Sequence, residues 1–150
     1  SLASLMIRNN RRLIAVGSGF ETKSSRSKES AKLLTYGITN FDTIEIAREN
    51  SKFTEIDVWL GEKDKIGVYS ETDIYKTIKK ARLNKLEAKI IYDGPIEAPI
   101  NKGDKIAKLI INYEGNLLSE HNLLALENIK KKNIISRILK SINYLIWGDV

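Results

Sequence analysis

The chain has 150 residues, 42% of them hydrophobic, so it can bury a core as one domain or two small ones. It contains no cysteine, which excludes disulfide bonds, thiolate nucleophiles and zinc–thiolate sites. The formal net charge is +6, and residues 128–150 hold five Lys or Arg against one Asp, which favours an anionic lipid surface as the partner and argues against a nucleic acid.

Two apolar runs at the N-terminus predict a β-hairpin. Residues 2–7 and 12–16 are rich in Leu, Ile and Val, and the turn-like residues 8–11 separate them. Neither run alternates with polar residues, so both strands are expected to be buried on both faces. Little chain follows to cover them, and the sequence opens without a methionine or a leader, so we expect it to be a fragment of a longer protein.

A helix is predicted next, from its candidate N-caps Ser24 and Ser25 to about Asn40. Ala31, Leu34 and Ile38 fall on one stripe of this helix. The preceding Gly-Ser-Gly at residues 17–19 is predicted to be a turn and not a phosphate cradle, because the rest of a phosphate-binding motif does not follow it.

From residue 41 to residue 127 apolar residues recur at every second position, in short segments broken by Gly, Pro and Asp. This pattern predicts several short strands and a small antiparallel β-sandwich, in a chain that is mostly β and α+β overall. His121 has no metal-ligand partner at a useful spacing, so we expect a strand residue, no metal site and no cofactor. Trp59 and Tyr75 either line a groove or pack in the core or at an edge, and packing is favoured.

The last segment, residues 129–147, predicts an amphipathic helix that lies in a membrane interface, with apolar residues at spacings of three and four and cations on the polar side. The alternative is a core-packing helix whose lysines face water. No run of about 18 apolar residues exists, so no transmembrane helix is predicted. The predicted membrane-binding residues are Lys130, Lys131, Lys132, Ile134, Ile135, Arg137, Ile138, Leu139, Lys140, Ile142, Tyr144, Leu145, Ile146 and Trp147.

Short segments spread over nearly the whole chain occur in an order that resembles a known family. They are Arg12-Leu13-Ile14-Ala15-Val16, residues 22–41, Val58-Trp59-Leu60-Gly61, Asp73-Ile74-Tyr75, Leu86-Glu87-Ala88-Lys89, Ala98-Pro99-Ile100, Lys102-Gly103-Asp104 and Leu124-Ala125-Leu126-Glu127. The series is similar to the C-terminal part of the serine-type D-alanyl-D-alanine carboxypeptidases, the low-molecular-mass penicillin-binding proteins that trim peptidoglycan stem peptides.

This resemblance implies three parts. Residues 1–41 would be the end of the penicillin-binding domain, residues 42–127 a β-sandwich stalk domain, and residues 128–150 a membrane-anchoring helix. The partners would be an anionic membrane, the N-terminal catalytic part of the same enzyme and, for the complete enzyme, a stem peptide. The location would be the periplasmic face of the bacterial cytoplasmic membrane. The alternative is a non-enzymatic interaction module of the cell envelope.

The resemblance also implies that this chain alone is inactive. The family uses Ser-x-x-Lys, Ser-x-Asn and Lys-Thr-Gly, and no Lys-Thr-Gly occurs here. Residues 25–28 and 141–143 fit the first two patterns, but we interpret both as chance matches and predict no catalytic residue. By resemblance, Arg26 would bind the carboxylate of the terminal D-alanine, or would be a solvated or locally paired first-turn arginine.

Overall fold

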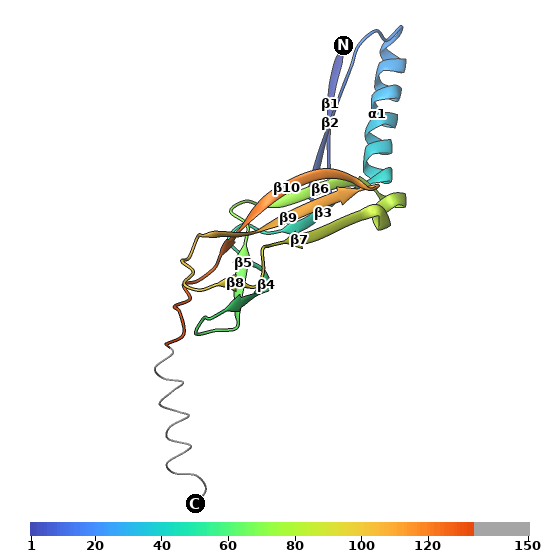
Figure 1. Ribbon diagram of the computed structural model, residues 1–150. Helices are drawn as coiled ribbons and strands as arrows, with labels where there is room; N and C mark the ends of the chain where they lie inside the picture. The colour runs from blue at the N-terminus through green and yellow to red at the C-terminus, as the bar shows by residue number, and fades with distance from the viewer. Residues whose placement is uncertain (134–150) are drawn as a thin grey trace, which may run out of the picture.

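The computed structural model describes residues 1–133, and residues 134–150 lie outside the described part. Two bodies follow one another along the chain (Figure 1). The first, which we call the hairpin–helix unit, comprises two strands and one long helix within residues 1–40. The second, the β domain, comprises the remaining described strands and one short 3-10 helix. The prediction of a mostly β chain is therefore confirmed.

The first two strands form the predicted hairpin. Strands β1 (Leu2–Arg8) and β2 (Arg11–Gly17) pair antiparallel along their whole length. Asn9 and Asn10 make the two-residue turn, and both have positive φ, 50° and 61°. Asn tolerates this left-handed backbone better than most residues, and two such residues in succession match the natural twist of a hairpin. The Asn-Asn pair therefore fixes the register of the two strands.

Helix α1 (Lys23–Asn40) starts with a reciprocal cap. The Oγ1 of Thr22 accepts a hydrogen bond from the Ser25 N–H at 3.0 Å, and the Oγ of Ser25 accepts one from the Thr22 N–H at 3.1 Å. The cap satisfies a backbone N–H group that the start of a helix leaves without a partner. The predicted N-cap at Ser24 or Ser25 is wrong, because both residues already lie inside the first turn.

One side of α1 covers one face of the hairpin (Figure 1). Ser30, Leu34 and Ile38 follow one another at intervals of four residues and are the buried side chains of the helix. Gly37 lets the two elements approach closely, since a Cβ atom there would lie 2.4 Å from Leu13 Cδ2. A larger residue at this position would therefore push the Leu13 side chain or β2 away from α1.

The opposite face of the hairpin has no cover within residues 1–133. Leu5, Ile7, Ile14 and Val16, which we call the apolar hairpin face, are 50%, 67%, 61% and 73% exposed. The prediction that both faces of these strands are buried is therefore wrong for the described residues. A single helix about 10 Å in diameter shields only one side of a two-stranded ribbon.

The strands of the β domain pair into two sheets that share one core. The elements are β3 (Phe41–Ala47), β4 (Lys52–Trp59), β5 (Lys65–Tyr69), β6 (Ile74–Lys79), η1 (Lys80–Lys85), β7 (Leu86–Ile91), β8 (Ile96–Glu97), β9 (Lys105–Tyr113) and β10 (Asn116–Ala125). Six strands form one sheet in the order β7-β9-β10-β5-β4-β8, and β3 pairs with β6 in the other. All pairs are antiparallel except β4 with β8. The centre of the core consists of Ile66, Val68, Leu109, Ile111 and Leu123, none more than 1% exposed.

The segment after β10 continues as extended chain along the β domain. Ile129 is 3% exposed, and its backbone N–H and C=O both pair with Ile100 at 2.9 Å. The Lys132 N–H donates to the Leu60 C=O at 2.7 Å. The prediction of a helix from Ile129 onward is therefore wrong for residues 129–133, since Ile129 belongs to the core of the β domain. The part of that prediction that falls on residues 134–150 lies outside the described residues.

Candidate functional site

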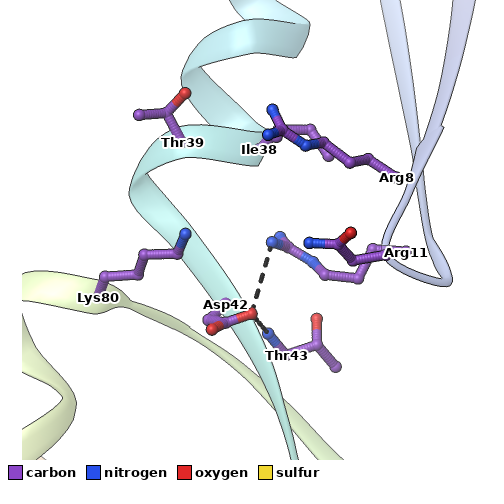
Figure 2. A pocket seen from close by; sticks show the side chains of 8 residues that line it. Arg8, Arg11, Ile38, Thr39, Asp42, Thr43 and Lys80 are labelled. Carbon is purple, nitrogen blue, oxygen red and sulfur yellow. Dashed lines mark hydrogen bonds and ion pairs between the residues drawn. The ribbon is translucent and has the colours of Figure 1, made fainter.

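A polar cleft lies where the hairpin–helix unit meets the β domain. The β1–β2 turn, the end of α1, the start of β3 and the start of η1 each contribute to it. Figure 2 shows its charged side chains around one opening. The cleft, which we call the junction cleft, has a volume of about 440 Å³ and is lined by Arg8, Asn9, Arg11, Ile38, Thr39, Asp42, Thr43 and Lys80.

Arg11 connects the hairpin to the first strand of the β domain. Its guanidinium donates a hydrogen bond to the Phe41 C=O and lies 3.8 Å from the Asp42 carboxylate. The Arg11 side chain is only 15% exposed. Oδ1 of Asp42 also accepts a hydrogen bond from the Thr43 N–H at 3.1 Å. Because a guanidinium carries five N–H donors, it can satisfy a carbonyl and a carboxylate together. Arg11 is therefore placed to hold the two units in contact.

The other two cations of the junction cleft have no ionic partner within residues 1–133. Arg8, at the end of β1, and Lys80, at the start of η1, are both exposed, and their side chains form no hydrogen bond or ion pair within the described residues. The cleft therefore holds three positive groups against one carboxylate. It lacks histidine and cysteine, and its carboxylate is already paired with Arg11. The excess of positive groups gives the cleft an electrostatic attraction for anions.

The sequence alone does not reveal the junction cleft. Its one local signal is the Arg-Asn-Asn-Arg turn of residues 8–11, which places two guanidinium groups at the same end of a hairpin. Lys80 stands far along the chain in a segment without a motif. It reaches the cleft because β3 pairs with β6 and so brings Lys79 opposite Phe41.

Arg26, the predicted substrate-binding residue, lies at the other end of α1. Its backbone N–H donates to the Thr22 C=O at 3.1 Å in the first turn of the helix. Ile38, at the junction cleft, is twelve residues further on, or about 18 Å at 1.5 Å per residue. The Arg26 side chain is partly exposed and makes no hydrogen bond or ion pair within residues 1–133. Arg26 therefore lies next to neither the junction cleft nor residues 130–132.

The Ser-x-x-Lys match at residues 25–28 has a structural explanation. The Oγ of Ser25 donates to the Thr22 C=O at 2.9 Å and accepts the Thr22 N–H at 3.1 Å. A hydroxyl that is engaged in this way in a helix cap is not activated by a neighbouring base. That Ser25 has no catalytic role stays a prediction. The second match, at residues 141–143, lies outside the described residues.

Three of the predicted membrane-binding residues fall within the described chain. Lys130, Lys131 and Lys132 are exposed and lie at the end of the molecule away from the hairpin–helix unit (Figure 1). Lys131 Nζ is 3.0 Å from a carboxylate oxygen of Glu97, and the Lys130 C=O accepts a hydrogen bond from the Glu62 N–H at 3.0 Å. The other predicted membrane-binding residues lie outside the described part. Among residues 1–133, no helix is both long enough and apolar enough to cross a bilayer.

His121 lies in β10, as the sequence predicts. Its Nε2 is 3.1 Å from the Ser119 Oγ. Burial, together with the nearby charge of Lys76, lowers the pKa of His121. In the described part of the chain, no three His, Asp or Glu side chains come together in a way that could hold a metal ion.

The two aromatic residues that we expected to pack are instead on the surface. Trp59 is 57% exposed and Tyr75 is 48% exposed, so packing in the core is wrong for both, while Tyr75 lies on β6 at the edge of the two-stranded sheet. The Tyr75 hydroxyl donates to Glu45 Oε2 at 3.1 Å. This hydrogen bond, with some burial, raises the pKa of Tyr75, because the ionised phenol would lose its acceptor and face a carboxylate.

Sequence relatives match both units. The D-alanyl-D-alanine carboxypeptidase DacD of Salmonella typhimurium is 30% identical over 139 residues, which cover 92% of this chain and 36% of that protein. The D-alanyl-D-alanine carboxypeptidase DacA of Escherichia coli is 27% identical over 135 residues, covering 89% of this chain and 34% of the relative. The chain thus spans only about a third of the length of these curated relatives.

Solved structures agree with the sequence relatives. Penicillin-binding protein 5 from Haemophilus influenzae superposes with a TM-score of 0.67 at 29% identity, over 87% of this chain and 38% of that one. The carboxypeptidase DacD of Francisella tularensis gives a TM-score of 0.61 at 27% identity, over 87% of this chain and 33% of that one. The family described as penicillin-binding protein 5, C-terminal domain, matches residues 41–131. The chain therefore belongs to the penicillin-binding protein 5 C-terminal domain family.

Proposed function

We propose that this chain is the C-terminal portion of a D-alanyl-D-alanine carboxypeptidase, and that it serves in peptidoglycan maturation as the stalk and membrane-surface anchor of that enzyme. The observation that carries the proposal is the 139-residue similarity to the DacD carboxypeptidase. This match is longer than the β domain, so it includes part of the hairpin–helix unit. In the complete enzyme a serine would be acylated by the stem peptide, D-alanine would leave, and water would release the acyl group.

The apolar hairpin face supports the proposal of a catalytic portion in contact with this chain. Its four large side chains are at least half exposed, although they lie on a regular hairpin whose other face is covered. Burying a side chain of this size fully contributes about 1.5–3 kcal/mol. A two-stranded ribbon is also only marginally stable alone. The partner that we propose for this face is the rest of the peptidase domain.

The distance between the two ends of the molecule supports the stalk role. Helix α1 ends at Asn40 and β3 begins at Phe41, with no residue between them. Arg11 braces the same junction. The start of α1 and the segment of residues 130–132 lie at opposite ends of the described part of the chain (Figure 1). An active site near Arg26 would stand away from a surface that the lysines contact, and Arg26 would receive the carboxylate of the terminal D-alanine.

The anchor role rests on the amphipathic sequence pattern of residues 134–147 and on the lysines just before it. We propose that the isoleucines and leucines from Ile134 to Ile146 enter the lipid interface, while the basic residues contact anionic headgroups. Each basic residue near such a surface contributes about 1 kcal/mol before screening. The proposed location is the periplasmic face of the bacterial cytoplasmic membrane.

A chimaera tests the enzymatic part of the proposal. The last third of Salmonella typhimurium DacD is replaced by this chain, and D-alanine release and labelling by fluorescent penicillin are measured. We expect D-alanine release and penicillin labelling in the chimaera, and neither activity in this chain alone. Leu5→Asp with Ile14→Asp should abolish both in the chimaera, whereas Leu117→Asp, at a leucine that is 63% exposed in the β domain, should not. An inactive chimaera that is otherwise folded would favour the non-enzymatic envelope module instead.

Vesicle binding tests the anchor. Truncation after Asn133 is preferable to truncation before Ile129, because Ile129 is part of the β-domain core. We expect the full chain to co-sediment with anionic vesicles in a salt-sensitive manner, and the truncated chain to remain in solution. Equal co-sedimentation of the two forms would contradict the anchor role while leaving the carboxypeptidase assignment untouched.

A further inference from the structure

The junction cleft has more positive charge than its internal contacts use. Arg11 is engaged with the Phe41 C=O and Asp42, and Asp42 also accepts the Thr43 N–H at 3.1 Å. Arg8 and Lys80 line the same cleft and have no ionic partner among the described residues. Three cations against one carboxylate leave two positive charges uncompensated. Like charges gathered around one opening repel one another unless an anion joins them.

We propose that the junction cleft is a binding site for a phosphate group. Two uncompensated charges match a phosphate monoester or inorganic phosphate, which carries about −1.5 to −2 at neutral pH, better than they match a single carboxylate. Guanidinium groups bind phosphate through paired N–H donors, and an ammonium group adds a compact point charge. The inference does not depend on the carboxypeptidase assignment, because it rests only on residues of this chain.

The neutral residues of the cleft suit the same ligand. Asn9 and Thr39 supply an amide and a hydroxyl group that can donate to phosphate oxygens, whereas the Thr43 hydroxyl is hydrogen-bonded to the Thr77 hydroxyl at 2.9 Å. Ile38, only 7% exposed, also lines the cleft and makes part of its wall apolar. An apolar wall strengthens the attraction between the ligand and the cations.

The bound phosphate would bridge the two units. Arg8 comes from the hairpin, Thr39 from the end of α1, and Lys80 from the 3-10 helix of the β domain (Figure 2). An anion that contacts all three would hold the hairpin–helix unit at one orientation on the β domain, in addition to the brace that Arg11 provides. The ligand site is therefore also a site at which the junction can be stiffened.

Titration with inorganic phosphate, followed by NMR at constant ionic strength, tests the site. We expect saturable shifts at the backbone amides of Asn9, Thr39 and Thr43. Arg8→Gln with Lys80→Gln should weaken the apparent affinity about tenfold or more, as expected for the loss of charge-assisted hydrogen bonds. Arg12→Gln with Lys85→Gln removes the same charge from exposed positions outside the cleft and should change the affinity less than about twofold.

Three results would overturn the proposal. Shifts spread over all lysine-rich surfaces would show general screening instead of a site. If the two double variants weakened the apparent affinity for phosphate equally, the binding would again reflect general screening instead of a site. If acetate shifted the same amide signals as strongly as phosphate at equal concentration, the cleft would not be selective for a dianion.

Displacement of radiolabelled phosphate in equilibrium dialysis identifies the source of the group. Vesicles that contain phosphatidate are compared with zwitterionic vesicles, using the full chain. Displacement by phosphatidate alone would support the site and assign it to a lipid headgroup. Retention of the label with both vesicles would support the site and assign it to a soluble phosphate compound.

Discussion

The β domain completes its own core, whereas the hairpin–helix unit does not. Fourteen buried hydrophobic residues of the β domain form one cluster, to which both sheets and Ile129 contribute. In the hairpin–helix unit, the buried hydrophobic residues are Ala15, Leu34 and Ile38, and the apolar hairpin face remains open. A closed core carries stability within the domain, whereas an open face requires a partner. The two halves of the chain therefore differ in how far their own residues determine their stability.

The largest expected effect tests the closed core. Leu109→Ala removes a side chain that is 0% exposed in the middle of β9 and should lower the free energy of unfolding by about 2–5 kcal/mol. Leu5→Ala, at a side chain that is 50% exposed, should change it by less than about 0.5 kcal/mol. Urea denaturation of both variants measures the difference. Similar losses would mean that the hairpin face is covered in the isolated chain.

The next effect tests the contact between the two regions. Arg11→Ala deletes the hydrogen bond to Phe41 and the ion pair with Asp42, and should destabilise the hairpin–helix unit by about 1–2 kcal/mol. Hydrogen exchange should show faster opening of β1 and β2, with β9 and β10 unchanged. Arg12→Ala, at an exposed neighbour, serves as the control. Faster exchange throughout the β domain would show that the two regions unfold as one body.

A smaller effect concerns the start of α1. Thr22→Ala removes the side chain that caps the helix and should cost about 1 kcal/mol of helix stability. Thr22→Ser keeps the hydroxyl and should behave like the unmodified chain. Hydrogen-exchange rates of the first-turn amides, measured in both variants, test this expectation. If both variants fray alike, the reciprocal cap with Ser25 does not stabilise the helix.

The smallest effect is a dependence on pH that should be confined to the β domain. Because the folded pKa of His121 is lower than its unfolded value of about 6.5, the unfolded state binds the proton more readily. The contribution of neutral His121 to the free energy of unfolding is present above the unfolded pKa and is lost as the pH falls through the folded pKa. Urea midpoints between pH 7.5 and pH 5 should therefore fall more in the unmodified chain than in His121→Gln. Parallel pH profiles, or a smaller fall in the unmodified chain, would contradict this.

Local signals in the sequence were sufficient for the hairpin, α1 and most strands. The Arg-Asn-Asn-Arg turn, the 3.6-residue stripe of Leu34 and Ile38, and the alternation around Leu109 each depend on neighbours within a few positions. Strand β5 has no alternation to detect, because Ile66, Gly67 and Val68 are all buried. In β10, residues 119–122 are all polar and the register shifts at two places, so no period-two apolar pattern runs along the strand.

The candidate sites could be predicted only in part, because they depend on contacts between distant segments. The junction cleft joins Arg8 to Lys80 through strand pairing that no local pattern encodes. Ile129 was the first residue of a predicted helix, yet its partner is Ile100 in the β domain. The spacing of its apolar neighbours was compatible with a helix or an extended segment, and backbone pairing with Ile100 makes the segment extended. Arg26 was named by resemblance alone and its role stays a prediction, although its position in α1 agrees with the predicted helix.

The joint at Phe41 has a mechanical consequence. This residue is both the C-cap of α1, where its N–H donates to the Gly37 C=O, and the first residue of β3. Its ring packs edge-on against Tyr36 at a centroid distance of 5.9 Å. Because no loop separates the helix from the strand, a rotation of α1 would pass directly to β3.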